Sequence, residues 1–150
     1  MKVVRIRLRL IREILDDKEL NVKVILLIRD PRGVLQSRRH DEFCHPSPDC
    51  WKPSLVCADM ISDYDAATQM LKKYPDRLMV LRYEELALKP NTTAHRILKF
   101  LKLSPTPSFD AFLQSHTNKD EPSVRSTYRI SRDVPFKWKY RLAFSYVNEI

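Results

Sequence analysis

The chain has 150 residues, of which 43% are hydrophobic and 31% are charged, a composition typical of a globular domain with its own core. No apolar run approaches the roughly 18 residues of a membrane span, and the first residues carry too many charges for a signal peptide. The net charge of +8 favours anionic partners over a merely solubilising surface. Gly33 is the single glycine, which excludes a glycine-rich phosphate loop from these residues.

The first half of the chain carries two strand patterns. Residues 2–10 alternate apolar and basic side chains, which predicts a strand with one basic face made of Arg5, Arg7 and Arg9. Residues 10–17 predict a short helix. Residues 22–28 are apolar on both faces, a pattern typical of a central parallel strand covered by helices.

The second half continues the alternation of helices and strands. Apolar side chains from Val56 to Tyr74 recur every three or four residues, which predicts an amphipathic helix ending before Pro75. A second buried strand is expected at 77–83, helices at 93–103 and 109–115, a long ordered loop or lid at 116–135 and the first turns of a helix at 144–150. This order predicts an α/β fold with a mostly parallel sheet flanked by helices.

Three cysteines, Cys44, Cys50 and Cys57, lie at spacings of six and seven, which do not match a CxxC metal site. We expect a Cys50–Cys57 disulfide formed in a secretory compartment; three free thiols in a cytosolic protein are the alternative. Asn91 begins the triplet Asn-Thr-Thr and is a candidate for N-linked glycosylation.

Arg29 and Ser37 are the candidate ligands of an anion. Arg29 directly follows a predicted parallel strand, and ligands of open α/β sheets bind beyond this edge. Asp30 suits a helix cap and Pro31 the first helical position. Ser37 lies seven residues past the cap, close to two turns, so it can converge with Arg29 on one phosphate.

The alternative for Arg29 is an ordinary surface ion pair with Asp30 or Asp41, of a kind that contributes little to stability. In the first interpretation, Arg38 and Arg39 would add positive field beside the anion.

The segment IRDPRGVLQSR closely resembles the 3′-phosphate-binding motif of sulfotransferases, in the variant found in Golgi carbohydrate 6-O-sulfotransferases of galactose, N-acetylglucosamine or N-acetylgalactosamine. The resemblance implies that Arg29 and Ser37 hold the 3′-phosphate of 3′-phosphoadenosine 5′-phosphosulfate. LRYEELALKP is similar to another family segment and implies that Tyr83 lies near the adenosine, with core packing as the alternative. STYRISRDVPFKWKYRL resembles a late segment and implies nucleotide contacts for Arg129 and Ser131, with plain solvation as the alternative.

The family's paired-cysteine segment resembles CWKPSLVCADMISDY, so the likeness covers nearly the whole chain. It implies a P-loop-like sulfotransferase fold. Residues 1–150 would be the C-terminal portion of one such domain, incomplete and inactive alone because the family's 5′-phosphosulfate loop is absent. The full-length protein would be anchored in the Golgi membrane and face the lumen.

The implied reaction transfers a sulfuryl group to a carbohydrate hydroxyl of a keratan-type, chondroitin-type or N-acetylglucosamine-bearing glycan, without a metal. No residue is assigned as catalytic base, although Glu84 and Glu85 are candidates if they reach the cleft. Trp138 is expected to anchor the end of the chain against the core. The competing hypothesis is a non-catalytic basic module that binds acidic polysaccharide or nucleic acid; a sulfotransferase would not bind nucleic acid.

Overall fold

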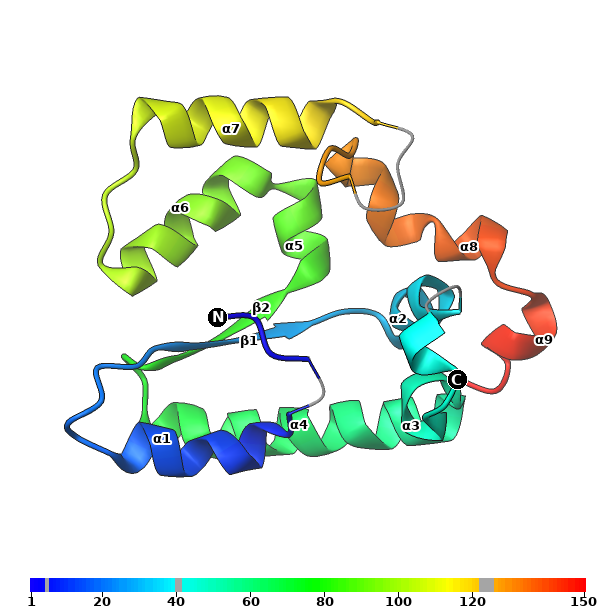
Figure 1. The fold of residues 1–150 in the computed structure, drawn as a ribbon, viewed down its shortest axis with the longest axis horizontal. Helices are drawn as coiled ribbons and strands as arrows, with labels where there is room; N and C mark the ends of the chain where they lie inside the picture. Colours follow the sequence, from blue (N-terminus) through cyan, green and yellow to red (C-terminus); the bar gives the residue numbers. More distant parts are fainter. Residues whose placement is uncertain (5, 40–41, 122–125) are drawn as a thin grey trace.

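The computed structural model describes residues 1–150 apart from 5, 40–41 and 122–125 (Figure 1). Short helices connect two strands and several longer helices. In chain order the elements are η1 Leu8–Ile11, α1 Arg12–Asp16, β1 Val24–Ile28, α2 Pro31–Arg38, η2 Glu42–Cys44, α3 Pro48–Trp51, α4 Pro53–Lys73, β2 Leu78–Arg82, α5 Tyr83–Leu88, α6 Pro90–Leu101, α7 Pro107–Asn118, η3 Ser131–Phe136, α8 Trp138–Arg141 and α9 Phe144–Val147.

The two strands form a parallel sheet between layers of helices. Val24 of β1 lies opposite Leu78 of β2, and Ile28 lies opposite Arg82. Figure 1 shows α1 and α4 on one side of the strands, and α6 and α7 on the other. This architecture confirms the α/β fold with parallel strands flanked by helices. Within the described residues, no helix is both long and apolar enough to cross a membrane.

The core lies where η1, α1 and α4 meet the sheet. Leu15 and Leu78 are each only 1% exposed, and Ala67, Met70 and Tyr74 of the α4 region pack into the same cluster. Burying a leucine side chain contributes about 1.5–3 kcal/mol relative to leaving it exposed. Because these side chains of the α4 region pack against Leu78 of β2, the core fixes the position of α4 relative to β2.

The predicted strand at 2–10 is wrong. The segment enters a 3-10 turn at Leu8, whose side chain is buried beside α4. The backbone N–H of Leu8 donates to Asp63 Oδ1 at 2.8 Å, and the Arg7 guanidinium pairs with Asp59. Carboxylates of α4 therefore hold this segment in place, whereas a β-strand would be held by backbone hydrogen bonds to a neighbouring strand. Arg5, the first of the three arginines on the expected basic face, lies outside the described residues.

The other expected elements are confirmed with small shifts, since β1, α4, β2, α6, α7 and α9 occupy the regions that periodicity indicated. The covering of β1 is incomplete, because Leu27 is 52% exposed. The segment 116–135 is less irregular than expected: α7 extends to Asn118, and η3 begins at Ser131.

The disulfide joins Cys44 to Cys50, so the predicted Cys50–Cys57 pairing is wrong. The short turn between η2 and α3 brings the Cα atoms of Cys44 and Cys50 to 5.2 Å, a separation typical of disulfides. Cys57 is a free thiol. It lies in α4, which begins at Pro53, and therefore outside the segment that the disulfide closes.

The Arg77 guanidinium fixes the connection that leads into β1. It donates to the carbonyl oxygens of Leu15 at 2.8 Å, Leu20 at 2.7 Å and Val22 at 3.1 Å. The Arg77 carbonyl in turn accepts from the Val24 N–H at 2.8 Å. The planar guanidinium spreads its donors in fixed directions over carbonyls that lie apart, whereas a lysine ammonium places its three donors on a single atom and does not match that spread.

We predict that Arg77→Lys lowers the free energy of unfolding by about 2 kcal/mol, because several charge-assisted hydrogen bonds to backbone carbonyls are lost. Chemical denaturation measures this change. Arg12→Lys is the matched control, because the Arg12 side chain is 64% exposed and makes only a weak pair with Asp16. Equal effects of the two substitutions would show that Arg77 does not act as a clamp.

Candidate anion-binding site

The site begins at the junction of β1 and α2. Asp30 caps α2, and its carboxylate accepts from the Arg32 N–H at 2.9 Å, with Pro31 at the first helical position, as the sequence predicts. The Arg32 guanidinium also binds both oxygens of Asp30, at 2.9 and 2.7 Å. Burial raises the pKa of Asp30, but the hydrogen bonds from Arg32 outweigh it, so the pKa lies below its usual value.

Asp30 therefore pairs with Arg32, and the alternative of an Arg29–Asp30 ion pair is wrong. Asp41, the other partner considered for Arg29, lies outside the described residues. The other face of the Arg32 guanidinium lies 3.9 Å from the centroid of the Trp138 ring. Trp138 is buried, which confirms it as an anchor for the last part of the chain.

Arg29 takes a different path, between α2 and α5. Its guanidinium carbon lies 4.4 Å from the centroid of the Tyr83 ring, a cation–π arrangement. The same side chain passes directly over Gly33, where an added Cβ would stand 2.9 Å from Arg29 Nε. The absence of a side chain at the single glycine thus gives the guanidinium its room.

One donor of Arg29 is buried without a protein acceptor. Among the buried side-chain nitrogen and oxygen atoms of the described residues, Arg29 Nε alone lacks a hydrogen-bond partner. Leaving a buried charged donor unsatisfied costs about 1–3 kcal/mol or more, and such groups point to an acceptor from outside the protein chain. An anion that accepts from the partly exposed guanidinium would satisfy this donor once the side chain shifts to uncover Nε.

Tyr83 lies between two arginines. The phenol is half-buried at the start of α5, and burial raises its pKa. The positive charges of Arg29 and Arg129 lower the pKa, while the negative charge of Glu84 raises it further, and the net result is a raised pKa. Arg29 and Arg129 therefore both lie within electrostatic reach of one ring, on segments a hundred residues apart in the sequence.

Glu84 fixes the two strand ends relative to each other. Its Oε1 accepts from the Asp30 N–H at 2.9 Å, so a carboxylate at the start of α5 holds the start of α2. Glu85 instead pairs with Arg96 at 2.7 Å on the exposed side of α6. Of the two candidate bases, only Glu84 lies beside Arg29 and Tyr83, and its hydrogen bond to the Asp30 N–H gives it a structural role.

The remaining predicted site residues are Ser37, Ser131 and Asn91. Ser37 is exposed in the last turn of α2, four residues after Gly33 and so on the same face of the helix. The Ser131 hydroxyl donates to the carbonyl oxygen of Ala87 at 2.8 Å, so its proton already has an acceptor in α5. Asn91 is exposed in the first turn of α6.

The family resemblance implied that Tyr83 lies near the nucleotide, but sequence reasoning missed its contact with Arg29, because periodicity carries no information about contacts between elements far apart in the sequence. It also missed the Arg32–Trp138 contact for the same reason. Across the residues that the structure describes, no three histidine, cysteine, aspartate or glutamate side chains are grouped so as to hold a metal ion.

A parallel α/β sheet with a basic site beyond the carboxyl ends of its strands is the arrangement of nucleotide-binding α/β proteins. Residues 8–145 match the family model described as the sulfotransferase domain, and the chain belongs to this family. It is 30% identical to carbohydrate sulfotransferase 1 of Mus musculus over 91% of this chain, and 30% identical to carbohydrate sulfotransferase 3 of Tetronarce californica over 96%. It is 28% identical to human carbohydrate sulfotransferase 6 over 95%.

The chain spans 38%, 36% and 42% of the lengths of these three relatives. No solved structure matches it.

We predict that Tyr83 titrates above the ordinary tyrosine value of 10.0, and that Arg29→Ala or Arg129→Ala raises this pKa further by removing a positive charge that favours the phenolate. Carbon-13 NMR of labelled tyrosine measures it in the parent and in both variants. Because the folded pKa lies above the unfolded one, this group's contribution to stability is present below pH 10 and lost as the pH rises through the folded pKa. An unchanged or lowered Tyr83 pKa in both variants would place the arginines away from the ring.

Proposed function

We propose that the protein transfers a sulfuryl group from 3′-phosphoadenosine 5′-phosphosulfate to a carbohydrate hydroxyl, and that this chain supplies the part of the domain that binds the donor's 3′-phosphate. One observation supports the proposal: the partly buried Arg29 side chain, whose Nε is unsatisfied, stands at the carboxyl edge of the parallel strands, over the face of α2 that carries Ser37.

The geometry around Arg29 suits a phosphate. A guanidinium presents donors in a plane and matches two phosphate oxygens at once. Tyr83 and Gly33 restrict its orientation before any ligand arrives, so little conformational freedom remains to be lost on binding. We assign Ser37 as a further donor to the same phosphate, since it follows Gly33 along one face of α2.

Arg129 is assigned to the nucleotide through its position near Tyr83. Its Nη1 donates to the Tyr128 carbonyl oxygen at 2.6 Å and lies 3.7 Å from Asp120 Oδ1. Ser131 acts indirectly in this proposal, because its bond to Ala87 ties η3, and with it the Arg129 segment, to α5. Tyr83 supports Arg29 with its ring face, so its contact with adenosine would use the ring edge.

In the proposed reaction, a sulfuryl group moves in line between two oxygens, and negative charge spreads over the transferring group. Positioning and electrostatic stabilisation then dominate catalysis, as in phosphoryl transfer. The residues of this chain bind and orient the donor. The 5′-phosphosulfate loop and the base that accepts the hydroxyl proton are not assigned to any residue of this chain, which spans about two fifths of its relatives' length.

Location and acceptor follow from the same proposal. A disulfide between Cys44 and Cys50 is typical of an oxidising compartment, which supports a Golgi-lumenal protein. The exposed Asn91 would then be open to glycosylation. The relatives are carbohydrate sulfotransferases, which supports a carbohydrate acceptor, and we propose a keratan-type, chondroitin-type or N-acetylglucosamine-bearing glycan.

The alternative, a non-catalytic basic module, loses part of its support. Its basic strand does not form, and Arg7 is paired with Asp59. The net charge of +8 still favours an anionic ligand, which the proposed donor also satisfies.

We predict that Arg29→Ala weakens binding of 3′-phosphoadenosine 5′-phosphate by about ten- to hundredfold, the loss expected for a charge-assisted bidentate contact. Adenosine 5′-monophosphate, which lacks the 3′-phosphate, should bind with nearly unchanged affinity. Isothermal titration calorimetry measures both constants. Arg132→Ala is the control, since its side chain is 79% exposed on the neighbouring η3. Equal losses for the two nucleotides would remove the 3′-phosphate from Arg29.

A second prediction concerns Gly33→Ala. The substitution raises helix propensity by about 1 kcal/mol, which stabilises the fold. The new Cβ would stand 2.9 Å from Arg29 Nε and displace the guanidinium from the Tyr83 ring. We therefore expect weaker binding of 3′-phosphoadenosine 5′-phosphate in a variant that is at least as resistant to denaturant as the parent. Retained affinity would show that Arg29 binds in another orientation.

A further inference from the structure

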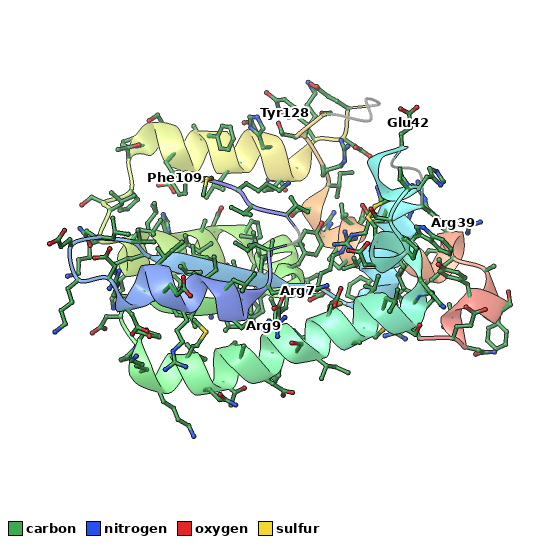
Figure 2. All side chains as sticks on the ribbon, turned by 60° about the horizontal axis from the view of Figure 1, so that its bottom comes forward. Arg7, Arg9, Arg39, Glu42, Phe109 and Tyr128 are labelled. Atoms are coloured by element: carbon green, nitrogen blue, oxygen red, sulfur yellow. A yellow bond between two sulfur atoms is a disulfide. The ribbon has the colours of Figure 1, made fainter. Side chains whose placement is uncertain are left out.

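A cavity lies at the C-terminal end of α2, away from Arg29. It has a volume of about 500 Å³, within the usual range of small-molecule sites. Three segments form it: the last residues of α2, the disulfide loop and the segment around α9. Figure 2 labels Arg39 at this end of the molecule. The lining residues that carry the argument are Arg38, Arg39, His45, Trp51 and Tyr146.

The walls of the cavity are tied together. The Cys44–Cys50 disulfide closes the loop, and the Arg38 guanidinium donates to the Cys50 carbonyl oxygen at 3.3 Å. On the opposite wall the Tyr146 hydroxyl donates to the Trp51 carbonyl oxygen. The first two contacts are local and fix the disulfide loop to the end of α2, and the third joins residues 95 positions apart. The cavity is therefore largely preformed, and a ligand orders few groups on binding.

The lining combines positive charge with an exposed aromatic ring. Trp51 is 41% exposed, although a tryptophan of this domain's core, Trp138, is almost fully buried. Burial and Glu149 raise the pKa of Tyr146, while the positive charge of Arg39 lowers it, so the Arg39 charge acts at the cavity wall. Glu149 lies within electrostatic reach of Tyr146. The charged side chains that line the cavity itself are Arg38 and Arg39.

We propose that this pocket binds a pyranose unit that carries a sulfate or carboxylate group. The C–H face of the sugar ring would lie on the Trp51 indole, and the anionic group would accept hydrogen bonds from Arg39. A strand of nucleic acid fits less well, because such sites use several aromatic rings along an open basic groove. Among the described lining residues, Trp51 is the exposed aromatic ring besides the smaller imidazole of His45, so the lining offers no row of large rings along a groove. That this sugar belongs to the acceptor glycan rests on the proposed function.

The test titrates the protein with a chondroitin tetrasaccharide that carries one sulfate per disaccharide, and follows tryptophan fluorescence. Binding should change the Trp51 emission, and Trp51→Phe should abolish that change while Trp138 still emits. We expect Arg39→Ala to weaken binding about tenfold, the value of one charge-assisted contact. Arg9→Ala is the matched control: it removes the same charge from an exposed residue that Figure 2 shows beside α4, away from Arg39.

Three outcomes would overturn the proposal. The first is equal weakening by Arg39→Ala and Arg9→Ala, which would indicate a response to net charge alone. The second is equal affinity for neutral chitotetraose. The third is no binding, or displacement by single-stranded DNA at lower concentration than by the tetrasaccharide. Titration with 3′-phosphoadenosine 5′-phosphate separates the two proposals: if the nucleotide fails to bind and the sugar binds as expected, the donor site is wrong and the pocket stands.

Discussion

The guanidinium of Arg29, held between the Tyr83 ring and the bare backbone of Gly33, is the contact on which the candidate site depends. It requires the parallel register, because pairing of Ile28 with Arg82 brings the next residues, Arg29 and Tyr83, to the same edge. It also requires a fixed α2, which the Asp30 cap and the Glu84–Asp30 hydrogen bond supply. A one-residue slip between the strands would separate the ring from the cation.

Arg29 and Arg32 show how neighbouring arginines acquire different tasks. Arg32 lies in the first turn of α2 and pairs with Asp30, so its charge is neutralised, and its guanidinium lies over the Trp138 ring. Its role is to join the start of α2 to α8. Arg29 lies against the Tyr83 ring, which does not neutralise the arginine's charge and gives its Nε no hydrogen-bond acceptor. A sequence motif with both arginines therefore contains one structural cation and one that is available to an anion.

Much of this arrangement could be predicted from the sequence, wherever one local signal decides. The apolar run of β1, the three- and four-residue spacing of α4 and the Asp30-Pro31 cap depend on short-range patterns, and all three are confirmed. The strand expected at 2–10 failed because an alternating pattern reports which side chains are apolar and not which neighbour is present. Here the neighbour is α4, whose Asp63 accepts the Leu8 N–H.

The same limit applies to the disulfide and to Tyr83. Three cysteines permit three pairings, and the choice depends on the position at which α4 begins, a tertiary property. The Arg29–Tyr83 contact joins residues 54 positions apart and follows from strand register. Resemblance to a family indicated that Tyr83 belongs near the site. Only the coordinates show that its ring face is already covered by a guanidinium.

The two arginines near Tyr83 differ in how firmly the fold holds them. Arg29 follows a strand and is fixed by the sheet edge. Arg129 lies on a segment attached at both sides: its N–H donates to the His116 carbonyl oxygen of α7 at 2.9 Å, and Ser131 binds Ala87 of α5. The His116 ring stacks on Tyr128 with centroids 4.0 Å apart, which adds a third attachment.

These attachments explain how a segment with little regular structure can hold a cation near a ligand site. Each uses a backbone carbonyl or a ring of a packed helix, so the position of Arg129 is set by α5 and α7 and not by its own backbone conformation. Loops that carry binding residues are commonly positioned in this way by a rigid scaffold. Ser131 is then best understood as part of that scaffold, and in the proposed function Arg129 is the residue of the late segment that would contact the nucleotide.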